Sequence, residues 1–303
     1  MARKRLLRRP NSRPGRYVAL LRIEGEIVDG RSQRPPLKPP FALPFLLNER
    51  AGDLSVVQAA RQVLKDKRAA ALVVYIDSGG GSATASEAMT AALKKVAAKK
   101  PLVVAMGPVA ASGGYYVATP ARWMVAQPGT ITGSIGVLHG KFVNAGLLGK
   151  LLFSRETISR GKRAMLLSSE RPFSEEEREL IWRQIRRTYD LFLDRVAASR
   201  HLTCEAVDAV GGGRVWTGRQ ALERGLVDEL GGVDQALEKA RHLAGLSHRA
   251  PLREVRPGKR SLPPSPTSSL ALAQYVIEGW RQFNEAGTLC LCPLIVDDLS
   301  NDL

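Results

Sequence analysis

The sequence predicts an α/β protein built around parallel strands. Two continuous apolar runs, residues 70–76 and 101–106, have the composition of strands that are buried on both faces of a sheet. A segment that we expect to be helical follows each run, an alanine-rich one at 82–98 and a shorter one at 112–119. With 303 residues, 44% of them hydrophobic, the chain can bury a core of one large domain or two smaller ones. Strands that alternate with helices in this way are typical of parallel α/β folds.

The first half of the chain begins with a basic arm. Residues 1–16 hold seven lysines and arginines and no acid, and we expect them to lack regular structure. Residues 17–27 predict a first strand, and the proline-rich residues 28–52 predict a loop or arm. The elements expected next are a helix at 55–66, a strand at 70–76, a helix at 82–98 capped by Ser82 or Thr84, a strand at 101–106, a helix over 112–119 and a strand at 122–126.

The second half opens with a glycine-rich turn at 129–136 and a mixed segment at 138–158. Ser174 and Glu177 have the spacing of a capping box, which predicts a helix from there to about Ser199. The remaining elements expected within a domain of residues 17–245 are a helix at 204–210, a strand at 214–216, a helix from 217 and a helix at 234–244. Composition then predicts a linker at 246–268 and a C-terminal tail at 269–303, with amphipathic spacing over 270–283.

The composition narrows the range of partners. A formal net charge of +16 favours anionic partners, and for the basic arm we expect an anionic membrane surface rather than nucleic acid. Three cysteines and four scattered histidines form no disulfide framework and no metal motif, so no metal and no cofactor is expected. No run of about 18 apolar residues and no signal-peptide pattern is present. These features predict a cytoplasmic or peripherally membrane-associated protein.

The candidate catalytic nucleophile is Ser112, which lies in the stretch AASGGYY directly after an apolar run. A serine hydroxyl needs a base to act as a nucleophile. A second small-residue turn, DSGGGS at residues 77–82, follows the preceding strand. Adjacent parallel strands would bring both turns to the same edge of the sheet. Backbone N–H groups of the glycine turn and of Gly113 could then hold an oxyanion.

Several motifs together resemble the signal peptide peptidase (SppA) family of serine–lysine peptidases. These are DSGGGSATASE, AASGGYYVATPA, GTITGSIGV, SERPFSEEERELI and GGGRVWTGRQALERGLVDELGG. The resemblance implies a ClpP/crotonase-like fold of ββα superhelical repeats, with Ser112 as nucleophile and an oxyanion hole formed by Gly113 with Gly80 or Gly81. It also implies cleavage of hydrophobic peptides, such as remnants of signal peptides, and assembly into homo-oligomeric rings. Gly79 stands where the family usually has proline.

The general base departs from the family pattern. Where single-domain members have the catalytic lysine, a gapless count places Ala164, and Lys162 lies two residues earlier. The surrounding GKRAMLLSSERPF resembles the C-terminal half of double-length members, whose N-terminal half supplies the lysine. The lysine therefore comes from another chain (a second copy or an N-terminal-half homologue), or Lys162 reaches the serine, or the dyad is incomplete. Lys141 is a further amine, but no local pattern marks it as a base.

An incomplete dyad would make the protein a non-catalytic peptide-binding or scaffold subunit, which is the alternative to a peptidase. An acyl-CoA enzyme of the wider crotonase group would share the oxyanion-hole chemistry, but the motifs are closer to the peptidases. For the other prominent residues we expect structural roles: helix packing for Tyr115 and Tyr116, core or interface positions for Trp182 and Trp216, and a turn at Ser134. The resemblance places the turn of Ser134 near the substrate groove, where an extended peptide could add as a strand.

Overall fold

The computed structural model describes residues 15–33, 49–153 and 155–255. The chain forms two compact units. The first, called the sheet unit, comprises Met1–His139 and Leu180–Pro257, and the second, called the insert unit, comprises Gly140–Glu179 and Gly258–Leu303. Most of the basic arm, most of the proline-rich loop and the amphipathic tail segment lie outside the described residues.

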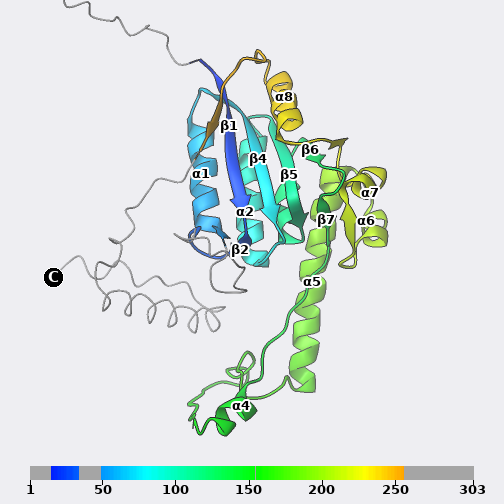
Figure 1. Cartoon of the computed structure of the whole chain (residues 1–303). Helices are drawn as coiled ribbons and strands as arrows, with labels where there is room; N and C mark the ends of the chain where they lie inside the picture. Colours follow the sequence, from blue (N-terminus) through cyan, green and yellow to red (C-terminus); the bar gives the residue numbers. More distant parts are fainter. Residues whose placement is uncertain (1–14, 34–48, 154, 256–303) are drawn as a thin grey trace, which may run out of the picture. The chain divides into compact units, whose positions relative to one another are not determined.

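The sheet unit is built on a mixed eight-stranded sheet (Figure 1). Its main path runs in the order β10 (Leu252–Glu254), β1 (Tyr17–Glu24), β4 (Ala69–Ser78), β5 (Leu102–Ala111), β6 (Trp123–Ala126) and β9 (Glu229–Leu230), with every pair parallel. Off this path, β7 (Ile131–Gly133) pairs in parallel with the carboxyl end of β5, and β8 (Val215–Thr217) pairs antiparallel with β7. The predicted α/β class is confirmed.

The helices alternate with the strands in part of the first half of the chain, and three of them follow one another in the second half. They are α1 (Asp53–Lys65), α2 (Ala83–Ala97), α3 (Gly113–Ala118), α4 (Ala145–Lys150), α5 (Glu175–Arg200), α6 (Cys204–Val210), α7 (Gly218–Glu223) and α8 (Val233–Leu243). A separate pair of short parallel strands is formed by β2 (Glu26–Val28) and β3 (Arg50–Gly52). Among the described residues, none of these helices has both the length and the apolar character that crossing a bilayer would require.

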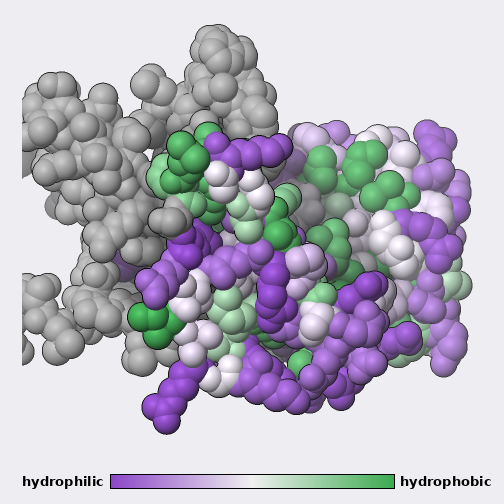
Figure 2. Space-filling model, turned by 90° about the horizontal axis from the view of Figure 1, so that it is seen from below, coloured by the Kyte–Doolittle hydropathy of each residue, from purple (hydrophilic) through white to green (hydrophobic). Residues whose placement is uncertain are grey.

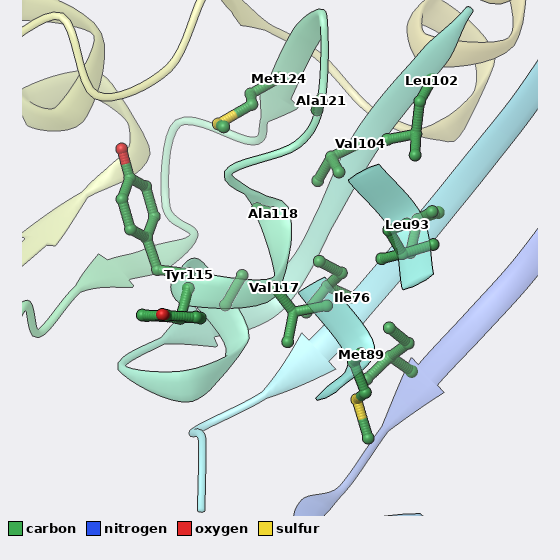
Figure 3. Close-up of a cluster of buried hydrophobic side chains, with 14 of the residues drawn as sticks. Ile76, Met89, Leu93, Leu102, Val104, Tyr115, Val117, Ala118, Ala121 and Met124 are labelled. Carbon is green, nitrogen blue, oxygen red and sulfur yellow. The ribbon is translucent and has the colours of Figure 1, made fainter. Parts of the chain in front are cut away.

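Two hydrophobic clusters lie on opposite faces of the sheet. Alternate residues of each central strand point to opposite faces, so Val18 and Leu20 of β1 belong to the smaller cluster under α8. Ala19, Leu21 and Ile23 of the same strand belong to the larger cluster, which also includes side chains of α1, α2, α3 and α5. Figure 3 shows part of this larger cluster around α3.

Local signals located the central elements correctly. Both apolar runs form strands of ten residues, β4 and β5. Of the two candidate caps of α2, Ser82 has the role, because its hydroxyl accepts a hydrogen bond from the N–H of Ala85 at 3.2 Å. The capping box is also present: the Ser174 N–H donates to the Glu177 carboxylate at 2.9 Å, and the Glu177 N–H donates to Ser174 Oγ at 3.3 Å.

Some boundaries differ from the expectation. The first strand ends at Glu24, because Gly25 adopts a φ of 83° and the chain turns into β2. β3 lies inside the segment expected to be a loop. β10 pairs with β1 beyond residue 245, so the sheet continues into the segment that composition assigned to a linker. Strands of two or three residues are too short for apolar periodicity to reveal them.

Candidate active site

Ser112 occupies a strained turn between β5 and α3. Its backbone has φ 52° and ψ −119°, a conformation that costs a non-glycine residue about 1–3 kcal/mol. The Ser112 N–H donates to the Gly133 carbonyl at 2.9 Å, and its carbonyl accepts from the Tyr116 N–H at 2.8 Å. A sharp strand-to-helix turn of this kind presents a serine hydroxyl at the edge of a sheet. The side chain is half-buried and lies at the carboxyl end of the sheet.

The glycine turn after β4 lies directly against this serine. β4 and β5 are parallel neighbours, with Ser78 paired in register with Ala110. A Cβ added to Gly80, which has a φ of 102°, would lie 2.7 Å from the Gly113 nitrogen and 2.9 Å from Ser112 Cβ. Only a glycine allows the two backbones to approach so closely. The two turns therefore meet at one edge of the sheet, as expected from parallel pairing.

The hydrogen bonds of the glycine turn leave particular N–H groups available. The Gly80 N–H donates to Ser78 Oγ at 3.1 Å, and the Gly80 carbonyl accepts from Ile27 N–H at 2.9 Å. Within the described residues, no hydrogen bond uses the N–H of Gly81 or of Gly113. A Cβ on Gly113 would lie 3.3 Å from the Gly81 nitrogen, so the two unused donors are close together beside Ser112.

Buried aromatic contacts hold α3 in place. The Tyr115 hydroxyl donates to the Leu226 carbonyl at 2.7 Å, and its side chain is fully buried. Tyr116 hydrogen bonds to Glu87, which also pairs with Arg195 at 2.6 Å. Burial, together with the hydrogen bond to Glu87, raises the pKa of Tyr116 to about 12. Both tyrosines are packing residues, as predicted.

The other residues noted in the sequence have varied positions. Trp216 is partly buried, and its Nε1 donates to the Val210 carbonyl at 3.0 Å. Trp182 has 64% of its surface exposed, so it is no core residue. Ser134 has a φ of 49° and its N–H donates to the Arg214 carbonyl at 2.7 Å, which is the geometry of a turn.

The described lysines of the sheet unit lie far from Ser112. They are at the ends of α1 and α2, in the turns that enter β4 and β5, or on α8 above Trp123, which begins β6. All of these positions are near the amino ends of the strands, whereas Ser112 follows the carboxyl end of β5. The ten residues of β5 span roughly 30 Å at about 3.3 Å per residue. Within the described part of this unit, no side chain hydrogen bonds to the Ser112 hydroxyl.

The lysines of the insert unit have contrasting environments. Lys162 has 77% of its side chain exposed and pairs with Glu176 at 3.0 Å. Lys141 is partly buried, and its Nζ donates to the Leu166 carbonyl at 2.9 Å and lies 4.3 Å from the centre of the Phe173 ring. The amine of Lys141 therefore lies against the 161–168 segment, in which the family pattern predicts a lysine.

Desolvation lowers the pKa of Lys141; the nearby Glu177 carboxylate opposes this change and the Arg171 guanidinium adds to it. Arg171 binds Glu177 through two hydrogen bonds of 2.7 Å each. This fork, together with the Ser174 N–H, lowers the pKa of Glu177 to about 2. Sequence reasoning missed the environment of Lys141, because its partner Leu166 is 25 residues away and no local pattern links them.

No group of three or more histidine, cysteine, aspartate or glutamate side chains that could bind a metal ion occurs in the ranges that the structure describes.

The fold and the two turns at the carboxyl end of the sheet define an α/β protein that holds a serine on a strained turn beside a glycine-rich turn. Residues 94–247, about half of the chain, match the model of peptidase family S49. The chain belongs to this family.

Named relatives agree with this assignment. The chain is 42% identical over 211 residues to a protein named "Serine protease SPPA, chloroplastic" from Arabidopsis thaliana, an alignment that covers 69% of this chain and 31% of the relative. It is 39% identical over 197 residues to the "Putative protease slr0021" of Synechocystis, covering 65% and 71%. It is 33% identical over 229 residues to "Protease 4" of Haemophilus influenzae, covering 75% and 34%. The chain thus spans about a third of the length of the first and third of these proteins.

Proposed function

We propose that this protein is a serine endopeptidase of the SppA type that cleaves hydrophobic peptides, including remnants of signal peptides. The observation that carries the proposal is the strained Ser112 turn, which packs against a glycine turn beside two unused N–H donors. Three relatives are named as proteases, which supports the same class of reaction. A strained residue held by its surroundings is typical of a functional site.

In the proposed mechanism, Ser112 Oγ attacks the carbonyl carbon of the scissile peptide bond. A lysine amine accepts the hydroxyl proton, and the carbonyl oxygen becomes an oxyanion. The N–H groups of Gly81 and Gly113 would hold that oxyanion; the Gly80 N–H is a poorer candidate, because Ser78 Oγ already accepts its hydrogen bond. The lysine then protonates the departing amine, and water hydrolyses the ester formed on Ser112.

Three sources of the lysine stay open: the insert unit of this chain, a second copy in a homo-oligomer, and an N-terminal-half homologue. Between the two insert-unit candidates, Lys141 has the better environment for a base, because desolvation favours its neutral amine. Lys162 is exposed and paired with Glu176, like an ordinary surface lysine. Position 164, where the family pattern predicts the base, holds an exposed alanine.

Further features of the family are proposed with the activity. The sheet would be part of a ClpP/crotonase-like arrangement of ββα repeats, and subunits would assemble into a ring. An extended peptide would bind beside the glycine-rich 129–136 segment, whose β7 strand pairs with the end of β5 next to Ser112. The protein would act in the cytoplasm or at a membrane surface.

The alternative is a non-catalytic subunit that binds peptides or supports an assembly. Ala164 favours it, because an alanine accepts no proton. In this alternative the glycine turns would still bind an extended peptide, but no acyl-enzyme would form on Ser112.

The test compares the full-length wild type with Ser112→Ala, Lys141→Ala and Lys162→Ala on a fluorogenic hydrophobic peptide. His201→Ala is the control, because His201 also has a positive φ, 55°, and it follows the end of α5, outside the proposed peptide-binding segment. We expect Ser112→Ala to abolish turnover and His201→Ala to leave it near the wild type. If an insert-unit lysine is the base, Lys141→Ala should lower turnover at least 100-fold and Lys162→Ala should not; unchanged turnover in both variants would exclude both candidate amines of the insert unit as the base. Turnover that survives Ser112→Ala would exclude the nucleophile. A folded wild type that binds the peptide but neither cleaves it nor reacts with a fluorophosphonate would establish the non-catalytic alternative.

A further inference from the structure

The two turns of the candidate site each open a helix, and these two helices contact each other. The Gly80–Gly81 turn leads into α2 through the cap Ser82, and Ser112 directly precedes α3, which begins at Gly113. The N–H groups proposed to hold the oxyanion, those of Gly81 and Gly113, therefore lie at the starts of two different helices. Their separation depends on how α2 and α3 are held together.

Polar side chains on one face of α2 contact the start of α3. A Cβ added to Gly113 would lie 2.6 Å from Ser86 Oγ, so this buried hydroxyl lies against the backbone of Gly113. Thr90 Oγ1 lies 3.4 Å from the Tyr116 carbonyl, and the Tyr116 hydroxyl donates to the Glu87 carboxylate. Residues three and four apart are neighbours on a helix surface, so residues 86, 87 and 90 share this face. The start of α3 is thus held by several hydrogen-bonding groups of α2.

The Glu87 carboxylate connects three helices of the sheet unit. One of its oxygens accepts the hydrogen bond from Tyr116 of α3, and the other pairs with Arg195 of α5 at 2.6 Å. The Tyr116 ring also packs against the ring of Phe192 of α5, with 4.9 Å between the ring centres. Hydrophilic and hydrophobic residues are interleaved on the face shown in Figure 2, so a polar side chain at the surface indicates little by itself. Glu87 differs because its two oxygens have partners on two other helices.

The backbone of Tyr116 connects this cluster to the nucleophile. The Tyr116 N–H donates to the Ser112 carbonyl at 2.8 Å, so a shift of Tyr116 also moves the Ser112 turn. That turn is strained, and a strained conformation persists only where its surroundings hold it. The geometry has little tolerance, because a displacement of about 1 Å at a reacting group can lower the rate of an enzyme about 100-fold.

We propose that Glu87 is a positioning residue of the candidate active site. Its carboxylate holds the Tyr116 hydroxyl, and the Tyr116 backbone in turn holds the Ser112 turn at the correct distance from the Gly81 N–H. Glu87 acts through Tyr116 and not on the peptide, so it is not a catalytic residue. The kinetic consequence rests on the proposed peptidase function, whereas the link from Glu87 to the Ser112 turn rests on the contacts alone.

The test compares the full-length wild type with Glu87→Ala, Tyr116→Phe and the double variant. Tyr116→Phe keeps the ring that packs against α5, so it removes the hydrogen bond with little loss of packing. Tyr17→Phe and Asp66→Ala are the matched controls, because the Tyr17 hydroxyl donates to the Asp66 carboxylate at 2.8 Å at the amino end of the sheet, opposite to Ser112. For each protein, kcat and KM are measured on a fluorogenic hydrophobic peptide, and hydrogen exchange is measured by mass spectrometry.

We expect Glu87→Ala and Tyr116→Phe each to lower kcat about tenfold and to change KM less than about twofold, because oxyanion donors act on charge that develops only in the transition state. The double variant should be no slower than the slower single variant, since both changes break the same contact. The amides of residues 112–118 should exchange about tenfold faster in these variants, relative to the amides of α8. Both controls should match the wild type in kcat and in the exchange of residues 112–118.

The exchange measurement separates this proposal from the peptidase function. Unchanged exchange of residues 112–118 in Glu87→Ala would overturn the proposal, whether or not the wild type cleaves the peptide. Faster exchange in a protein whose wild type has no turnover would reject the peptidase function and still support the link from Glu87 to the Ser112 turn. Additive losses of kcat in the double variant, or an equal loss in Asp66→Ala, would overturn the positioning role.

Discussion

Gly80→Ala gives a sharp test of how the site is built. The added Cβ would lie 2.7 Å from the Gly113 nitrogen and 2.9 Å from Ser112 Cβ, both closer than real Cβ contacts allow. Alanine at a φ of 102° costs about 1–3 kcal/mol, and the added crowding typically costs another 1–3 kcal/mol. The chain can relieve this crowding only by separating the two turns, which moves the Gly113 N–H.

We therefore expect Gly80→Ala to destabilise the fold by about 2–6 kcal/mol. Loss of one oxyanion donor would lower kcat by about 10²–10³-fold. Urea unfolding measures the first effect, and peptide turnover well below the unfolding midpoint measures the second. Gly79→Ala is the matched control, because Gly79 has no positive φ and no atom within 4 Å of an added Cβ. A Gly80→Ala protein with wild-type kcat, or a Gly79→Ala protein with the same loss, would refute this account of the site.

Three further predictions concern strain, a buried ion pair and acid stability. Ser112→Gly should be about 1 kcal/mol more stable to urea than Ser112→Ala, because glycine tolerates a φ of 52° and alanine does not. Arg200→Met should lower the free energy of unfolding by about 3 kcal/mol, because it leaves Asp228 without the partner that now lies 2.6 Å away on a largely buried guanidinium. The Arg171 guanidinium lowers the pKa of Glu177 to about 2. The stability that this carboxylate contributes is therefore complete above pH 4.5 and is lost as the pH falls from about 4.5 through about 2. An acid titration followed by circular dichroism, which reports the helix content of the protein, should show this loss in the wild type and not in Glu177→Gln.

Each of these has an outcome that contradicts it. Equal stability of the two Ser112 variants would mean that the turn is not strained. Arg200→Met should regain part of its stability when Asp228→Asn is added, and additive losses would argue against coupling within the pair. An identical acid titration of the wild type and Glu177→Gln would show that other carboxylates control unfolding in that range.

Sequence patterns predicted those elements that local signals define. The runs at 70–76 and 101–106, the Ser82 cap and the box of Ser174 with Glu177 all depend on residues close together in the chain. Short strands such as β9 and β10 depend instead on partners far away in the sequence. A strand of two or three residues has no periodicity of its own, so no local pattern could reveal it.

The same distinction holds for the candidate site: the feature set by consecutive strands was predictable, and the features set by distant segments were not. Parallel pairing of two consecutive strands was enough to predict that the two small-residue turns meet. The sequence favoured Lys162 over Lys141 as a candidate base, because no local pattern marked Lys141. The environment of an amine depends on contacts between distant segments, and those contacts leave Lys162 exposed and Lys141 partly buried. Residues 147–153 could not be classified either, since LLGKLLF has the composition of a buried helix, whereas α4 buries no residue.

The pairing of β10 with β1 has a consequence for biosynthesis. Val18 pairs with Leu252, and the Val255 N–H donates to the Leu20 carbonyl at 2.8 Å. About 230 residues separate these partners, so a ribosome working at about 5–20 residues per second makes β10 on the order of 10–50 s after β1. Throughout that interval the outer edge of an apolar strand is open to pairing with other nascent chains. A truncated gene product that ended at residue 245 would keep that edge open permanently.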